Sequence, residues 1–507
     1  MPKRLLKNAS YSAAGQVVNM AVSILFVPAY IYFLGIEGYG IYSFFLMLFG
    51  WITMIQAGID PAVIRMTAKY AAMSDQPKIN ALVTASIIFQ ISVASLIGVV
   101  FFLSSDYLAS FIVKNEISFL HETKVALYYA GANIVILMWR NVYVAFFMGL
   151  QRYDISSVYD ALFNLVASLL AIVAVWFGFG IVGMIATRLV INILSIVVLH
   201  NVAKKVEPSF GFSLTISKEL LKEIYDYASW IVAGRMNRLA INALPPILIN
   251  TYVGPSGIAY FNIATRIVMA LNNLLSSATN VIFPFVSELV TLQDAERTRS
   301  AYLSANRLLS LVSAPLYCFG VIYSWDLLYF WLGSDVADNA WLLMGIFFVG
   351  YYLTSASMVP SNFALGMGNV KLLAFTGFIQ TAIIVVTLPL LLKTFGIEGA
   401  GLNLILFEFA SIVMGIIITT KIIGASNFTF WIRDRLLMLL ISSGIFSMFI
   451  PLKNIFPQGV ITRVEMAVYL GCVFLLGMAI YVVILMKTNL VDHETKSRLV
   501  KIVKKSS

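Results

Sequence analysis

Two arginines lie three residues apart within an apolar stretch that is long enough to cross a membrane. Arg235 and Arg238 fall near the middle of residues 228–250, which read ASWIVAGRMNRLAINALPPILIN, and Asn242 continues the same helical face. A guanidinium keeps its charge, and placing one at the centre of a bilayer costs about 2.5–3.5 kcal/mol on the mildest insertion scale. Two on one segment therefore require polar surroundings. The planar fork of arginine suits phosphate groups in particular.

Four further arginines fall inside apolar segments, and they are Arg140, Arg188, Arg266 and Arg307. Glu408 is the one acid expected near the middle of a span, so acids cannot neutralise all six arginines. If lipid surrounded all six, the cost would approach roughly 15–20 kcal/mol, which exceeds the total stability of a typical protein. We therefore expect the arginines to line a wet cavity between two halves of the chain.

A cationic cavity of this kind suits an anionic substrate. The predicted substrate-binding residues are Arg235, Arg238, Arg266, Asn242, Arg140 and Arg188. Glu408 is expected either to bind a coupling ion or to form a charge pair with an arginine, and Arg307 is grouped with it. The alternative for each arginine is a structural role, in which it bonds to carbonyls and acids inside the helix bundle and touches no substrate.

The composition places the chain among integral membrane proteins. Of its 507 residues, 60% are hydrophobic and 11% are charged, and the mean hydropathy is +0.90; soluble domains carry about 25% charged residues. The two cysteines lie in apolar runs and the three histidines form no cluster, so we expect no metal site and no cofactor. No P-loop or nucleophile–base pair is present either, which argues against an enzyme. The net charge of +10 is attributed to basic cytoplasmic loops rather than to nucleic-acid binding.

Apolar runs of about 20 residues predict about fourteen transmembrane helices and an all-α integral membrane fold. The expected spans are 9–34, 38–58, 80–103, 121–149, 155–177, 180–201, 224–251, 257–286, 300–330, 339–365, 370–392, 397–420, 434–451 and 464–486. Lysine and arginine concentrate in alternate connecting segments, beginning with the N-terminus, which predicts that both termini are cytoplasmic.

An internal repeat relates the first six spans to the next six. PAYIYFLGIEGYGIYSF (28–44) matches PPILINTYVGPSGIAYF (245–261), AFFMGLQRY (145–153) matches NFALGMGNV (362–370), and FGIVGMI (179–185) matches FGIEGAG (395–401). Because six is even, the two six-helix halves should share one orientation and be related by a pseudo-twofold axis along the membrane normal. The predicted parts are an N-terminal half (1–201), a cytoplasmic linker (202–223), a C-terminal half (224–421), two additional transmembrane helices (422–486) and a basic cytoplasmic tail (487–507).

This architecture and the stretch NASYSAAGQVVNMAVSILFVPAYIYFLGIEGYGIYSFF (8–45) resemble the Wzx-type O-antigen flippases. These belong to the polysaccharide-exporter branch of the multidrug/oligosaccharidyl-lipid/polysaccharide (MOP) superfamily. The resemblance implies a flippase that moves an undecaprenyl-pyrophosphate-linked oligosaccharide from the inner to the outer leaflet of a bacterial cytoplasmic membrane. It also implies the partners: the polyprenyl-pyrophosphate-linked glycan, membrane lipids, and polysaccharide polymerase and assembly proteins, but no nucleic acid. It supplies no motif that would assign site residues one by one.

Three other functions were weighed. A MATE-like multidrug or cation exporter of the same superfamily would be expected to place carboxylates in its cavity, whereas this chain offers arginines. A membrane-embedded glycosyltransferase or polymerase would usually need a sizeable outer loop or a catalytic acid with a metal. The longest outer loop expected here, about 104–120, offers little beyond Asp106, Lys114 and Glu116. A structural scaffold would leave the buried arginines unexplained.

Overall fold

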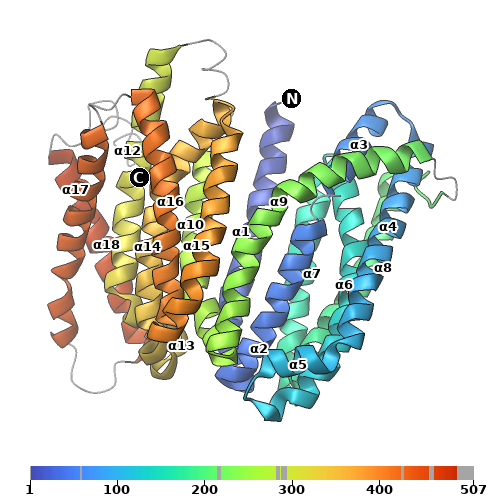
Figure 1. Ribbon diagram of the computed structural model, residues 1–507, viewed down its shortest axis with the longest axis horizontal. Helices are drawn as coiled ribbons and strands as arrows, with labels where there is room; N and C mark the ends of the chain where they lie inside the picture. The colour runs from blue at the N-terminus through green and yellow to red at the C-terminus, as the bar shows by residue number, and fades with distance from the viewer. Residues whose placement is uncertain are drawn as a thin grey trace. The chain divides into compact units, whose positions relative to one another are not determined.

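Long α-helices make up the structure, a computed structural model that describes residues 2–56, 60–213, 218–280, 286, 294–423, 428–455 and 462–487 (Figure 1). The helices are α1 (Pro2–Leu25), α2 (Val27–Gln56), α3 (Asp60–Ala72), α4 (Gln76–Leu103), α5 (Ser105–Val113), η1 (Ile117–Phe119), α6 (Leu120–Gly149), α7 (Tyr153–Trp176), α8 (Gly180–Val206), α9 (Lys218–Tyr252), α10 (Pro255–Asn280), α12 (Ala295–Ile322), α13 (Ser324–Leu332), α14 (Ser334–Gly366), α15 (Val370–Phe395), α16 (Glu398–Ile423), α17 (Phe428–Ser447), η3 (Ile450–Ile455) and α18 (Arg463–Lys487). The predicted basic tail lies outside the described residues apart from its first residue, Lys487.

The all-α membrane fold expected from the apolar runs is confirmed. Within the described part of the chain, twelve helical stretches are long and apolar enough to cross a membrane. The predicted spans 9–34 and 224–251 are also helical, but α1 and α9 are not among the twelve. Charged and polar side chains interrupt the apolar residues of both helices and lower their mean hydropathy.

Three boundaries differ from those expected. The segment 104–120 is not an open loop, because α5 occupies most of it and buries Ala109, Ile112 and Val113 at helical spacing. The span expected at 300–330 is divided at Tyr323 into α12 and α13. The linker expected at 202–223 overlaps the next helix, since α9 begins at Lys218 and continues as one curved helix through Tyr252 (Figure 1).

Charged residues define some helix starts through their side chains. Asp75 precedes α4, and its carboxylate accepts a hydrogen bond from the backbone N–H of Lys78 at 3.2 Å, with a proline in the first turn. Asp294 precedes α12 in the same manner and accepts from the N–H of Arg297 at 2.9 Å. These caps satisfy N–H groups that have no partner within the helix.

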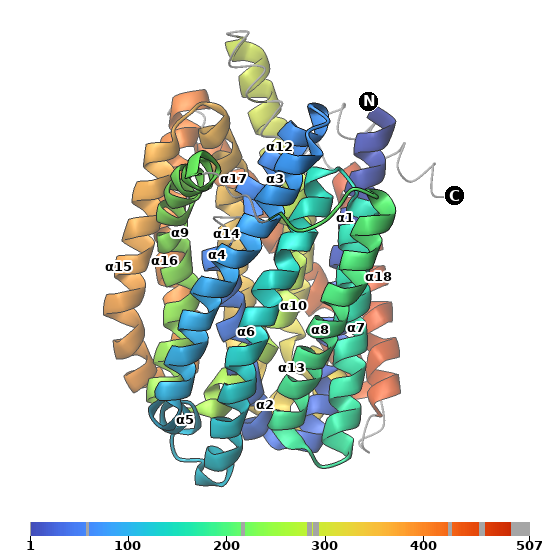
Figure 2. The ribbon, with the colours of Figure 1, turned by 90° about the vertical axis from the view of Figure 1, so that its right-hand side faces the viewer.

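The chain divides into two compact units, residues 1–262 and 263–507, and each is described here by itself. In the N-terminal unit, α6 packs against α4 and α8, and α7 packs against α1 and α8 (Figure 2). Gly98 and Gly131 allow α4 and α6 to approach closely, because a Cβ added at Gly98 would lie 3.3 Å from the Gly131 carbonyl oxygen. α9 belongs to this unit and packs against α2 and α3. The division into halves at the 202–223 linker remains a prediction.

The repeat is visible in the backbone turns. Residues with positive φ recur at offsets of 217–219 (254 − 35 = 219, 333 − 114 = 219, 368 − 151 = 217, 396 − 178 = 218), and the pairs are Gly35 with Gly254, Lys114 with Gly333, Gln151 with Gly368, and Gly178 with Gly396. The short helices α5 and α13 each have nine residues and occupy the same place in the order. The helices from α6 to α8 therefore correspond to those from α14 to α16.

Candidate functional site

A cavity of about 240 Å³ lies within the N-terminal unit, among α2, α6, α7 and α8. Its polar lining consists of Asn133, Arg140, Asp160, Asn164, Arg188 and Asn192, and its apolar lining consists of Leu46, Phe49, Leu137, Phe163 and Ala167. Two of the arginines singled out from the sequence, Arg140 and Arg188, are thus brought to one cavity. The cavity is formed by helices of one unit, whereas the sequence suggested a position between two halves.

Arg140 forms an ion pair across the cavity wall. Its Nη2 lies 2.7 Å from Oδ1 of Asp160, and the arginine is only 6% exposed. Nε of Arg140 is buried without a hydrogen-bond partner among the described residues. For Arg140 the structure therefore shows the alternative that the sequence left open, a bond to an acid inside the bundle, and that acid is Asp160 rather than Glu408. Asp160 is about two turns from the start of α7, and Arg140 is about two and a half turns from the end of α6. Because a short turn joins these two helices, the two residues lie at a similar distance from it and their side chains can meet.

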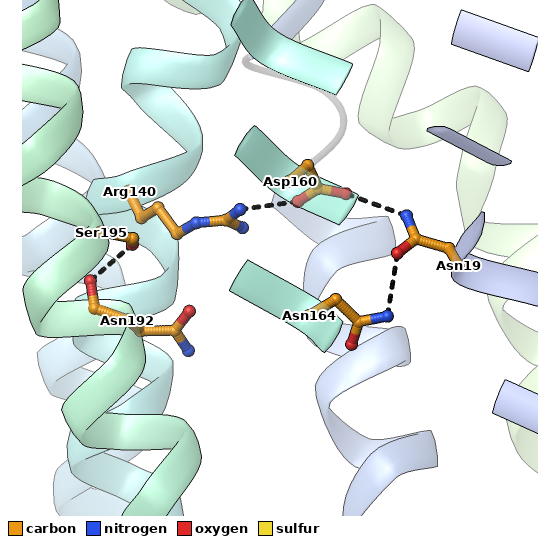
Figure 3. A network of polar contacts seen from close by, with 6 residues as sticks. All are labelled: Asn19, Arg140, Asp160, Asn164, Asn192 and Ser195. Atoms are coloured by element: carbon orange, nitrogen blue, oxygen red, sulfur yellow. Dashed lines mark hydrogen bonds and ion pairs between the residues drawn. The ribbon is translucent and has the colours of Figure 1, made fainter. Parts of the chain in front are cut away.

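Asparagines extend this ion pair into a network (Figure 3). Asn19 of α1 donates from Nδ2 to Oδ2 of Asp160 at 3.2 Å, and Asn164 donates to Oδ1 of Asn19 at 2.9 Å. Asp160 and Asn164 are four residues apart and so share one face of α7. On the opposite side of the cavity, Asn192 donates to Oδ1 of Asn133 at 2.8 Å. The network fixes the Asp160 carboxylate from two helices besides its own.

Arg188 is held differently from Arg140. Its Nε donates to the hydroxyl of Tyr42 at 3.1 Å, and it forms no ion pair with any residue that the structure describes. Tyr42 is fully buried and packs edge-on against Tyr30, so it anchors the guanidinium from the α2 side. Since Asp160 is the one acid of the lining, the two arginines leave the cavity with a formal charge of +1. Such a cavity can bind an anion.

The other predicted site residues are not brought together within either unit. The side chain of Arg235 lies outside the described residues. Arg238 and Asn242 are exposed on α9, and Asn242 donates to the backbone carbonyl of Arg238 at 2.7 Å. Arg266 and Arg307 are half-buried on α10 and α12 in the C-terminal unit. A clamp formed by Arg235, Arg238 and Arg266 therefore remains a prediction.

The buried charged residues of the C-terminal unit include Glu408 and Arg435. Glu408 on α16 is 3% exposed and accepts a hydrogen bond from the Thr354 hydroxyl at 2.8 Å. Arg435 on α17 is 7% exposed, and its Nη2 donates to the carbonyl of Ser355 at 3.4 Å. The sequence analysis did not single out Arg435, because the predicted span began at residue 434. The structure begins that helix at Phe428, which places the arginine two turns inside it.

A bundle of apolar helices around a charged interior cavity is the architecture of a multi-pass membrane transporter. The fold agrees with that class. It matches the inward-facing conformation of a multidrug resistance MATE family transporter of the MOP superfamily with a TM-score of 0.66 and 18% identity, over 80% of this chain and 94% of that one. It matches the lipid II flippase MurJ in its inward closed conformation with a TM-score of 0.66 and 13% identity, over 95% and 100% of the two chains.

The chain belongs to the family described as polysaccharide biosynthesis protein, whose model matches residues 32–340. A putative O-antigen transporter of Shigella flexneri is 16% identical over 403 residues, which are 79% of this chain and 94% of that protein. An uncharacterized membrane protein of Methanocaldococcus jannaschii is 24% identical over 483 residues, 92% of this chain and 91% of that protein. The predicted membership of the polysaccharide branch of the MOP exporters is therefore confirmed, and its named relatives are transporters and flippases.

Proposed function

We propose that this flippase moves an anionic, undecaprenyl-pyrophosphate-linked oligosaccharide from the cytoplasmic to the outer leaflet of a bacterial cytoplasmic membrane. The observation that carries the proposal is the cationic cavity of the N-terminal unit. Arg140 is already paired with Asp160, whereas the partner of Arg188 among the residues that the structure describes is the neutral hydroxyl of Tyr42. Arg188 therefore has its guanidinium available for an anionic group that enters the cavity.

The chemistry of such a substrate matches the lining. The pyrophosphate would bind arginine through charge-assisted hydrogen bonds, asparagine side chains would hydrogen-bond to sugar hydroxyls, and the polyprenyl chain would stay in lipid. Alternating access then exposes the loaded cavity to each side in turn. If two negative charges cross without compensation, an inside-negative potential favours export by roughly 4–5 kcal/mol per 100 mV.

The same proposal includes location and partners. The basic N-terminus and basic loops support cytoplasmic locations for both termini. The partners are the lipid-linked glycan, membrane lipids, and polysaccharide polymerase and assembly proteins. A MATE-like export of organic cations is the alternative, and it fits less well because arginines outnumber acids in the lining.

Arg188 offers the direct test. Reconstituted liposomes would be loaded with a fluorescent polyprenyl-pyrophosphate oligosaccharide, and its flipping would be followed with wild type, Arg188→Ala and Arg188→Lys. Loss of one charge-assisted hydrogen bond is worth about 1.5–3 kcal/mol, so Arg188→Ala should slow flipping by roughly 10- to 100-fold. Arg188→Lys should retain part of the rate, because lysine keeps the charge but not the fork.

The matched control is Arg152→Ala. Arg152 lies just before α7, outside the cavity lining, and pairs with Asp154 at 2.9 Å. Its replacement should leave the flipping rate near that of wild type. Unchanged flipping by a folded Arg188→Ala protein would remove Arg188 from the substrate site. Uptake of organic cations by a wild type that flips no lipid-linked sugar would favour the drug-exporter alternative.

A further inference from the structure

The hydroxyl of Tyr42 binds the inner end of the Arg188 guanidinium. A guanidinium carries five N–H groups, one on Nε and two on each Nη, in a fixed planar fork. The Nε–H of Arg188 donates to the Tyr42 hydroxyl at 3.1 Å, and Arg188 forms no other hydrogen bond within the part of the chain that the structure describes. Because Arg188 lines the cavity, its two Nη groups are left for a ligand. An oxyanion would meet the outer edge of the fork, where each Nη can bind one of its oxygens.

Packing holds Tyr42 in place. Its side chain is fully buried, and its ring lies edge-on to that of Tyr30 with the centroids 5.4 Å apart. The Tyr30 hydroxyl in turn donates to the backbone carbonyl of Ser168 on α7 at 3.3 Å. A buried hydroxyl needs a hydrogen-bond partner, and Arg188 supplies one to Tyr42. The two tyrosines therefore connect the arginine of α8 to α2 and α7.

A turn inside α2 brings the two tyrosines together. Tyr30 and Tyr42 are 12 positions apart (42 − 30 = 12), which along a straight helix would separate their Cα atoms by about 18 Å. Gly35 lies between them and has φ 70° and ψ 178°, a conformation outside the helical region that glycine adopts readily. The chain changes direction there, so one residue from each side of the turn can join the aromatic contact. The position of the Arg188 guanidinium thus depends on this turn as well as on α8.

The internal repeat supports a link between the hydroxyl and the arginine. At the offset of 219 found for the turn at the start of the repeat, the counterpart of Tyr42 is Phe261 (42 + 219 = 261). At the offset of 218 found for the turn before α8, the counterpart of Arg188 is Leu406 (188 + 218 = 406). The second repeat therefore keeps the ring and lacks both the phenol oxygen and the guanidinium. The oxygen is present where there is an N–H for it to accept from.

We propose that Tyr42 is a positioning residue of the anion site, whose hydroxyl holds Nε of Arg188 and so directs both Nη groups into the cavity. The class of ligand is an oxyanion with two oxygens that accept in parallel, as in a phosphate or pyrophosphate group. Without the hydroxyl, the guanidinium can rotate and its fork is no longer presented in one orientation. That the oxyanion belongs to a lipid-linked glycan rests on the proposed function, whereas the positioning of Arg188 does not.

Tyr42→Phe tests the site without lipid, because it removes one oxygen and keeps the ring. Inorganic pyrophosphate is titrated into the purified full-length protein in detergent, and its affinity is measured by calorimetry. Loss of one hydrogen bond should weaken the affinity of Tyr42→Phe by roughly 3- to 10-fold. In an Arg188→Ala background the same change should cause no further loss, since the hydroxyl then has no guanidinium to hold.

Tyr39→Phe is the matched control. Tyr39 is equally buried, lies about one turn earlier on the same helix, and donates from its hydroxyl to Oδ1 of Asn262 at 3.2 Å. Its replacement should lower thermal stability about as much as Tyr42→Phe does, while the affinity for pyrophosphate stays near that of wild type. Equal affinity of Tyr42→Phe and wild type, or an equal loss with and without Arg188, would overturn the positioning role. Absence of pyrophosphate binding by wild type would overturn the anion site itself.

The liposome flipping assay separates this inference from the proposed function. Tyr42→Phe should raise the concentration of lipid-linked sugar that gives half the maximal rate and leave the maximal rate near that of wild type, because the hydroxyl acts on binding of the anion. If wild type binds pyrophosphate with the expected dependence on Tyr42 but flips no lipid-linked sugar, the positioning role stands and the proposed substrate fails. If wild type flips the sugar and Tyr42→Phe does so with an unchanged half-saturating concentration, the proposed function stands and the positioning role fails.

Discussion

At the scale of single residues, Asp160 decides whether Arg140 can be buried. Removing one partner of a buried charged hydrogen bond leaves the other without compensation. Asp160→Ala should therefore lower the free energy of unfolding by about 2 kcal/mol, a value reduced because the aspartate side chain is 42% exposed. Asp160→Asn should cost less, since the amide oxygen can still accept from Arg140. Thermal unfolding of the purified protein in detergent measures both.

Asp154→Ala is the control for that series. Asp154 pairs with Arg152 where both side chains are more than a third exposed, and pairs of this kind contribute about 0–1 kcal/mol. An Asp154→Ala protein that loses as much stability as Asp160→Ala would show that the Arg140–Asp160 pair has no special structural role.

The two cavity arginines also show how far the sequence predicts contacts. The Arg140–Asp160 pair was predictable in principle, because both residues lie about two turns from the same helix–helix turn. The contact between Arg188 and Tyr42 joins residues 146 positions apart and depends on how α8 packs against α2. Burial of arginine in an apolar segment therefore indicates a polar interior, but it does not identify the partner.

At the scale of helices, close approach depends on glycine in α2. A Cβ at Gly40 would overlap the carbonyl oxygen of Pro255, at the start of α10. Because backbone cannot move aside as a flexible side chain can, Gly40→Ala should destabilise the protein by about 1–3 kcal/mol. Gly50 lies on the same helix and has nothing within 4 Å of its would-be Cβ, so Gly50→Ala should be neutral or stabilising by up to about 1 kcal/mol.

Thermal unfolding of the two alanine variants beside wild type measures these effects. The signs should be opposite, since the same chemical change meets backbone at one position and open space at the other. A rise in melting temperature of similar size for both variants would mean that helix propensity in α2, rather than its packing, governs the result.

The positions of the long helices were predicted well, because a helix that spans a bilayer needs about 20 consecutive apolar residues and such runs are visible in the sequence. Positions were missed where the helix is short. The nine residues of α5 and of α13 are too few to span, so they were assigned to a loop and to the end of a longer helix. Their helical form follows from packing against α6 and α14, which a single span-length criterion does not include.

At the scale of the whole molecule, the two units differ in their interior charges although their turns correspond. The cavity of the N-terminal unit is lined by two arginines and one aspartate. The residues at the matching positions of the C-terminal unit are Ser357, Gly377 and Leu406, so this charged cluster is not repeated. The repeat therefore preserves the backbone while it leaves the interior side chains free to differ.

The orientation of this whole assembly in the membrane is open to a direct test. Ser74 is exposed just before α4, and Asn115 is exposed just after α5, the short helix that follows the other end of α4. The 28 residues of α4 span about 42 Å, more than the roughly 30 Å of a bilayer core (Figure 1). Lys69 and Lys78 flank Ser74, so we expect that end to be cytoplasmic. After Cys318 and Cys472 are replaced by serine, an impermeant maleimide should label Asn115→Cys in intact cells and Ser74→Cys only after permeabilisation. The reverse pattern would place the N-terminus outside and would invert the proposed direction of transport.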